Sequence, residues 1–355
     1  MPAPEYRHDR PMDIPRRGLS IVELMVSTVV ALLVGLAATG SAVVFTASQR
    51  QGLGVGSAAL NGAAALAAIK RDVAAAGLGF FGDSTFRCHT LNLSVYNTVI
   101  TDASSFTPAL ITSLGNNDRI DIVYASQISA GTSVLLNAAS DGSSVELRSL
   151  LPASVGQAVL LAPATPGSPC LLRSITAMAS ATADSKQQLS FARTGRYNQV
   201  VFPNSPAFPD KSSATLFGDM VWSRYRLDGT DLLMERPMFG DSAVLHRNVV
   251  GLRAQYGVAA AGGTTIERWQ DASGPDFAAM TSATLPRVRA LRIGLVTRSA
   301  QREKEAASGH CEASMNKPEL FGNTVDPDLS DWACYRYRSA VTVVPLRNFV
   351  WGLAP

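Results

Sequence analysis

The most uneven feature of the hydrophobic pattern is a long uncharged stretch near the N-terminus. Residues 24–45 read LMVSTVVALLVGLAATGSAVVF and contain no charged side chain. An α-helix needs about 20 apolar residues to cross the hydrocarbon core of a membrane, so this stretch is long enough to span one. The polar stretch before it contains Arg7, Arg10, Arg16 and Arg17. This excess of arginine predicts that the N-terminus stays in the cytoplasm and that the C-terminal part is exported.

The next segment keeps helical spacing but becomes amphipathic. Leu53, Leu60, Ala64 and Ala67 recur at intervals typical of one helix face. We therefore expect one helix over about 20–76, with a membrane-spanning part at 19–47, an amphipathic part at 48–79, and a stop at Gly77 and Gly79. The helix interior also contains several glycines, which favour either local unwinding between 35 and 56 or close packing of neighbouring helices: Gly35, Gly40, Gly52, Gly54 and Gly56.

Beyond residue 80 the pattern changes to short alternating runs separated by turn residues. Such runs at 119–126, 143–150, 157–162, 249–258, 288–299 and 335–344 predict antiparallel strands. The clearest hairpin joins 221–227 to 232–237 through a turn at Asp228 and Gly229. We expect long connections at 180–188, 203–213, 259–284 and 301–331. The predicted fold class is α+β, in which a long N-terminal helix packs on a predominantly antiparallel β-rich periplasmic domain over 80–355.

The junction between the polar and apolar segments resembles the type IV pilin family. The residues GLSIVELMV place Gly18 at the junction and Glu23 five residues after it. The resemblance implies that residues 1–18 form a leader, that prepilin peptidase cuts between Gly18 and Leu19, and that Leu19 becomes the methylated N-terminus. The family usually has Phe at the position of Leu19, and major pilins often have Pro at that of Gly40. An uncleaved signal anchor is the alternative.

The resemblance also implies a role for Glu23, since an acid inside a membrane span is a functional-site hypothesis. Glu23 is expected to pair with the new N-terminal amine and thereby to fix the register of assembly. In the family the amine belongs to an adjacent subunit, although Leu19 of the same chain is only one helical turn away.

The C-terminal half resembles the PilW-type minor pilins, which are related to the J-type minor pseudopilins of type II secretion. The signal is the order of strands at 249–256 and 285–299, the loop with Trp269, a cysteine-bracketed insertion, and a last strand followed by Arg347 and Asn348. The resemblance implies a single-pass inner-membrane protein that enters the pilus, primes its assembly and lies at or near its tip. Its implied partners are other minor pilins, the major pilin, prepilin peptidase and the inner-membrane assembly platform, with a tip adhesin as a further candidate. A secretion pseudopilin and a membrane-anchored periplasmic enzyme or binding protein are the alternatives.

Charge and motifs narrow the function further. The chain has 31 basic and 28 acidic side chains, a net charge of +3, and no run of Lys or Arg, so nucleic-acid binding is not expected. The sequence contains no GxxxxGK[ST], GxSxG or HExxH motif, so we expect no catalytic residue, no cofactor and no enzyme activity. Asp228 and Asp231 suit a turn better than a calcium site.

Four cysteines lie in the part predicted to be exported, where disulfides persist. Of the three possible pairings, the sequence favours Cys311 with Cys334, which closes a loop between two strands, and then Cys88 with Cys170 by elimination. A zinc site using His89 or His310 is a weaker alternative, and no metal is expected. Two further groups of residues each have two interpretations. Arg287, Arg289 and Arg292 form either a docking face or an ordinary solvated strand face. Trp332, Tyr335 and Tyr337 belong either to the core or to a site for a partner.

Overall fold

The computed structural model describes residues 20–81, 86, 88–127, 131–165, 167–179, 186–203, 205, 207–274, 277, 280, 284–306 and 308–351. The chain divides into two compact units, 1–53 and 54–355. Each unit is described by itself below. The predicted cleavage site, Gly18 and Leu19, lies outside the described residues.

Helix α1 spans Ile21–Ala75 without interruption. Within the first unit, Ile21–Ala42 is exposed and has a mean hydropathy of 2.4, and it is long enough to cross a membrane. The expected unwinding between Gly35 and Gly56 is wrong, because the helix continues through these residues, whose cost of up to about 1 kcal/mol each is spread among good helix formers. An added Cβ at Gly35, Gly40, Gly52 or Gly56 would meet no atom within 4 Å, so close packing against other helices stays a prediction.

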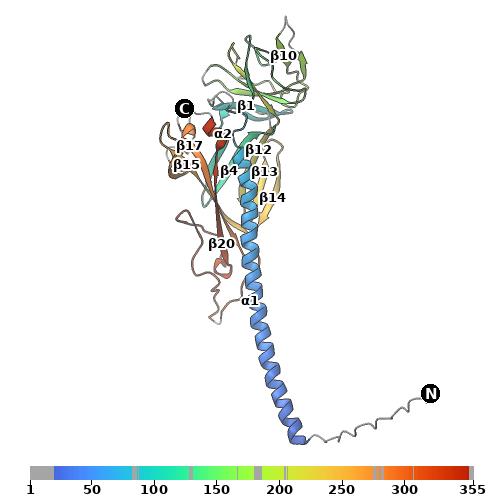
Figure 1. Ribbon diagram of the computed structural model, residues 1–355, viewed down its shortest axis with the longest axis vertical. Helices are drawn as coiled ribbons and strands as arrows, with labels where there is room; N and C mark the ends of the chain where they lie inside the picture. Colours follow the sequence, from blue (N-terminus) through green and yellow to red (C-terminus); the bar gives the residue numbers. More distant parts are fainter. Residues whose placement is uncertain are drawn as a thin grey trace, which may run out of the picture. The chain divides into compact units, whose positions relative to one another are not determined.

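Within the second unit, one face of α1 packs into the β domain (Figure 1). The buried side chains recur at helical spacing, namely Ala65, Leu66, Ile69, Val73 and Ala76. The predicted stop at Gly77 and Gly79 is confirmed, since both glycines have positive φ, at 78° and 88°. A Cβ at Gly77 would lie 2.7 Å from the Phe81 ring, so glycine also permits close packing there.

Two antiparallel sheets form the core around this helix segment. The five-stranded sheet has the order β14-β13-β12-β4-β3, formed by Asp241–Arg247, Asp231–Arg236, Met220–Asp228, Asn117–Ala125 and Ala109–Leu114. The four-stranded sheet has the order β16-β15-β17-β20, formed by Ile266–Asp271, Val249–Ala259, Val288–Arg298 and Tyr337–Pro345. The short helix α2, Arg347–Trp351, follows β20. The predicted hairpin is confirmed, with Asp228 opposite Asp231 and Gly229 at a φ of 57°.

The remaining strands form a six-stranded sheet, β2-β1-β8-β7-β11-β5, and a three-stranded sheet, β6-β10-β9. In chain order these strands are β1 Thr90–Val95, β2 Thr98–Ser105, β5 Ser133–Leu135, β6 Ser144–Leu147, β7 Ala158–Ala162, β8 Cys170–Ser174, β9 Ala177–Ala179, β10 Gln187–Ser190 and β11 Ser213–Gly218. They enclose two further apolar clusters, one of which contains Cys88 and Cys170. Among the described strands only β1 and β8 pair in parallel.

The α+β class is confirmed, and two of the predicted connections prove to contain strands. Strand β16 lies inside the expected 259–284 connection, and the small β18–β19 pair, Glu319–Leu320 with Asn323–Thr324, lies inside 301–331. Both escaped prediction because their residues are largely polar and half-exposed, so they lack the apolar alternation of a buried strand.

Candidate functional site

Glu23 lies in the first turn of α1, on the exposed apolar segment. It shares a helix face with Val26, Val30 and Val34, and no described residue forms an ion pair with it. A carboxylate in such apolar surroundings needs a cation or a proton when the segment enters a membrane. The arrangement therefore leaves Glu23 available for a charge supplied from outside the described residues.

The second part of α1 is fixed to the β domain by a buried carboxylate that sequence reasoning missed. Asp72 is 8% exposed. It accepts hydrogen bonds from the hydroxyl of Tyr124 on β4, at 3.1 Å, and from the hydroxyl of Tyr225 on β12, at 2.7 Å. The available signal was an acid at helical spacing among the inward-facing Ile69, Val73 and Ala76. We call Asp72, Tyr124 and Tyr225 the Asp72 junction.

Polar contacts on either side of the Asp72 junction hold the same helix. The Thr297 hydroxyl of β17 donates to the carbonyl of Ala58 at 2.9 Å. The Asn348 amide of α2 donates to the carbonyls of Ala75 and Ala76, at 3.2 and 3.0 Å. The Asn348 contacts satisfy carbonyls at the helix end, and together with the Thr297 contact they fix the helix segment in one register on the two sheets.

Replacement of Tyr225 by phenylalanine is expected to destabilise the β domain by about 1–3 kcal/mol, because one oxygen of buried Asp72 loses its donor. Urea unfolding of the full chain in detergent, followed by tryptophan fluorescence, measures the effect. Tyr96→Phe is the control, since Tyr96 is 57% exposed and should tolerate the change. Equal stability of both variants would show that the Asp72 junction contributes nothing.

The Asp72 junction also predicts a response to alkaline pH. Burial and the Asp72 carboxylate raise the pKa of Tyr225 above its ordinary value of 10.0, and the same two causes raise the pKa of Tyr124 to about 12. Above pH 10 the unfolded chain therefore releases protons that the folded chain retains. The stability from these two hydroxyls is complete below pH 10 and decreases as the pH rises beyond it.

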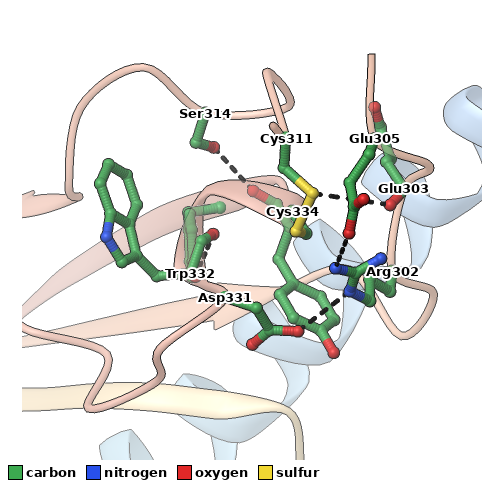
Figure 2. The surroundings of a disulfide bond; sticks show 10 residues. Arg302, Glu303, Glu305, Cys311, Ser314, Asp331, Trp332 and Cys334 are labelled. Carbon is green, nitrogen blue, oxygen red and sulfur yellow. Dashed lines mark hydrogen bonds and ion pairs between the residues drawn. A yellow bond between two sulfur atoms is a disulfide. The ribbon is translucent and has the colours of Figure 1, made fainter. Parts of the chain in front are cut away.

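The structure joins Cys311 to Cys334 and Cys88 to Cys170, the two pairs that the sequence favours. Figure 2 shows the first of these bonds with the charged residues around it. Arg302 forms ion pairs with Asp331 at 3.1 Å and with Glu305 at 2.8 Å. Arg336 pairs with Glu303. Arg302 thus binds the cysteine-bracketed insertion to the segment before it, and the Arg336–Glu303 pair joins the two segments that flank it.

The same insertion covers the outer face of the four-stranded sheet. Leu320 and Val325 pack on Val250 and Val296 in a small apolar cluster. A Cβ at Gly251 would lie 2.6 Å from Val325, so this glycine allows the loop to approach the sheet closely. Lys317 pairs with Asp326 at 2.7 Å, across the β18–β19 pair. The 301–336 segment is therefore a folded strap, which we call the disulfide strap.

Loss of the Cys311–Cys334 bond is expected to loosen the disulfide strap. Closing a loop with this sequence separation of 23 contributes about 3 kcal/mol in the chain-entropy account. Peptide mapping without reductant should recover the linked pair, and the double change Cys311→Ser with Cys334→Ser should speed tryptic cutting at Lys304 and Lys317. Removing Cys88 and Cys170 instead should leave the cutting at these lysines unchanged. Free thiols at 311 and 334 in the native chain would contradict the prediction.

The structure separates the three arginines of β17 and its neighbourhood. Arg289 is 5% exposed and donates to the carbonyl of Gly263 at 3.1 Å, and Arg287 donates to the carbonyl of Ala259 at 3.1 Å. Arg292 lies over the rings of Trp269 and Phe321, at 4.8 and 4.4 Å. Arg289 is therefore buried and belongs to neither kind of face, whereas Arg287 and Arg292 are half-exposed and hold contacts within the domain.

The other candidate residues have structural contacts. Asp228 and Asp231 are paired across the hairpin end. Tyr337 donates to the Trp332 carbonyl at 2.8 Å, and the Tyr335 ring lies 4.3 Å from the Arg298 guanidinium carbon. Among the described residues, no cluster of His, Cys, Asp or Glu has a geometry that would hold a metal ion.

Comparison with known proteins finds a similarity over the C-terminal part of the chain. Residues 224–348, from within β12 to α2, match the family model described as Type IV Pilus-assembly protein W. This match confirms the resemblance to PilW-type proteins predicted from the sequence. No curated protein matches the chain significantly.

One solved structure that resembles the chain is a type IV-like pilin from Thermus thermophilus, at 9% sequence identity. The alignment covers 83% of this chain and 98% of that chain, with a TM-score of 0.34.

Proposed function

We propose that the protein is a minor type IV pilin, a structural subunit that primes pilus assembly with other minor pilins at or near the pilus tip. The observation that carries the proposal is the match of residues 224–348 to the PilW family. The apolar Ile21–Ala42 segment supports it, because a pilin needs a helix that is held in the membrane before assembly. Such a subunit functions by packing against neighbouring subunits, and the matched family indicates a structural protein.

In this proposal the protein begins as a single-pass inner-membrane protein with its β domain in the periplasm. Prepilin peptidase removes residues 1–18, and the amine of Leu19 becomes the N-terminus. Glu23 then receives the positive charge of this amine or of the equivalent amine in a neighbouring subunit. The pairing places the new subunit at a defined height beside its neighbours, with the assembly platform, the major pilin and other minor pilins as partners.

The Asp72 junction supports the same proposal within the second unit. A pilus subunit needs its β domain held in a fixed place on the helix segment that enters it. The buried pairing of Asp72 with Tyr124 and Tyr225 holds the helix segment in one register on the sheets. It is therefore a positioning device for the domain.

Purification of the mature chain from its native cells tests the proposal through the proteins that accompany it. Minor and major pilins should co-purify with it, and deletion of its gene should reduce surface piliation. Co-purification with type II secretion subunits would instead assign it to a pseudopilus, which shares the same N-terminal features. A chain without either set of partners and with an unprocessed N-terminus would support a membrane-anchored enzyme or binding protein.

A further inference from the structure

Strand β20, Tyr337–Pro345, ends the order of its sheet and has β17 as its neighbour along its full length. The register of this pair contains no bulge. The main chain of Leu346 donates to the Arg289 carbonyl, and the main chain of Ser299, just after β17, donates to the Arg336 carbonyl, just before β20. Even-numbered residues therefore direct their backbone groups toward β17. The N–H and C=O groups of Ser339, Val341 and Val343 consequently face the free edge.

The composition of this edge suits pairing with another strand. Residues 339–346 contain no charge, and Val341 and Val343 are 52% and 46% exposed. Pro345 lies at an odd position, where its missing N–H would face the free edge and leaves the ladder to β17 intact. An exposed, uncharged and regular edge is a template for a further strand.

The other long sheet edges of the described structure are protected. Strand β16 has charged residues along it, Glu267, Arg268 and Asp271, and β14 pairs with β13 through a register shift. Strand β2 contains Asp102 and pairs irregularly with β1. The main chain of Ile111 on β3 donates to the Tyr256 hydroxyl. Strand β20 differs from all four, so its open edge is not a general property of this fold.

The charges at the two ends of β20 indicate what binds there. Arg338 and Arg347 are exposed, and neither forms an ion pair with a described residue. An extended segment with apolar side chains at alternate positions and carboxylates near both ends would complement this edge in hydrogen bonding, shape and charge.

A second copy of the chain does not fit this edge. Ala340 lies beside Gly62 and Asn348 beside Ala75, so β20 runs in the same direction as this part of α1. Antiparallel pairing of two β20 strands would direct the two copies of this α1 segment in opposite directions. Parallel pairing of two β20 strands about a two-fold axis would place each residue opposite its own copy. A parallel ladder instead needs one strand shifted by one residue, so the two-fold arrangement does not allow it.

We infer that the free edge of β20 is a docking site for an extended segment of another pilus subunit, which adds a strand beside Val341 and Val343 between Arg338 and Arg347. The inference rests on the proposed function, since it names how this subunit would contact a different one. The bound segment supplies main-chain hydrogen bonds to the odd-numbered residues, and its terminal carboxylates select the register.

The test uses the full chain in detergent and a fluorescent synthetic peptide as long as β20, with alternating valine and threonine and a glutamate at each end. Fluorescence anisotropy measures binding. We expect the unmodified chain to bind this peptide, and a peptide N-methylated at alternate residues not to bind, because it cannot form the strand ladder. The double change Arg338→Glu with Arg347→Glu should weaken binding at least about tenfold. A peptide with lysine at both ends should restore binding to that variant.

Arg247→Glu is the matched control, because Arg247 is an exposed arginine at the end of another edge strand, β14. It should leave peptide binding unchanged. The inference is overturned if no peptide binds or if the N-methylated peptide binds equally well. It is also overturned if Arg247→Glu weakens binding as much as Arg338→Glu with Arg347→Glu does. A dimer of the chain that this double change dissociates would overturn it too. These measurements involve no pilus, so their failure leaves the pilin proposal to its own test of processing and co-purification.

Discussion

Cells that carry Glu23→Ala are expected to retain the protein in the membrane but to lose its incorporation into the pilus complex. A charged side chain at the centre of a membrane span costs about 2.5–3.5 kcal/mol, so removing it leaves insertion unchanged or improves it. An amine within about 4 Å of the carboxylate would contribute about 4 kcal/mol at an effective dielectric of about 20, before desolvation is subtracted. The variant loses this attraction, and with it the preference for one register.

The measurement is the amount of partner pilin that co-purifies with the variant, together with a count of surface pili. Ser27→Ala is the matched control, because Ser27 lies one turn further along the same face of α1 and donates only to the carbonyl of Leu24. The control should assemble normally. Normal piliation and normal co-purification with Glu23→Ala would exclude a registry role for this carboxylate.

Replacement of Gly18 by valine is expected to block removal of residues 1–18 altogether. A peptidase must reach the backbone at the bond that it cuts, and a branched side chain at this position hinders that approach. The uncleaved chain would have no amine at Leu19, so Glu23 would lose its proposed partner as well. Intact mass measurement distinguishes the two lengths, 355 residues before cleavage and 337 after it, which is 355 less 18.

Gly35→Val is the control for this change, since an added Cβ at Gly35 meets no atom within 4 Å in the structure. It should be processed like the native chain. Processing of Gly18→Val at the normal position would mean that the junction glycine is not required. A native mature chain that begins beyond Ser41 would point to an ordinary signal peptide instead.

Much of the architecture was predictable because its signals are local. The helix over Ile21–Ala75 follows from one uninterrupted periodicity, and Gly77 and Gly79 end it through positive φ angles. The hairpin at Asp228–Asp231 follows from its turn residues. The uncharged run over 24–45 and the acid just before it, Glu23, are visible without any structure, so a helix long enough to span a membrane could be predicted directly.

The features that were missed depend on residues far apart in the chain. Asp72 and Tyr225 are separated by 153 positions, so nothing near Asp72 reveals that two tyrosines satisfy its carboxylate. Arg292 reads as a solvated strand residue until Phe321 of the disulfide strap is brought over it. The expected unwinding at the glycines failed for a different reason, because propensity alone overestimated a cost that the surrounding helix tolerates.

The central claim, that this chain is a processed pilus subunit, is tested most directly by mass spectrometry of pili sheared from the cell surface. We predict that the sheared fraction contains this chain beginning at Leu19, with a methyl group on its N-terminal amine and both disulfides intact. Detection of the chain only in the membrane fraction, with residues 1–18 still attached, would contradict the account.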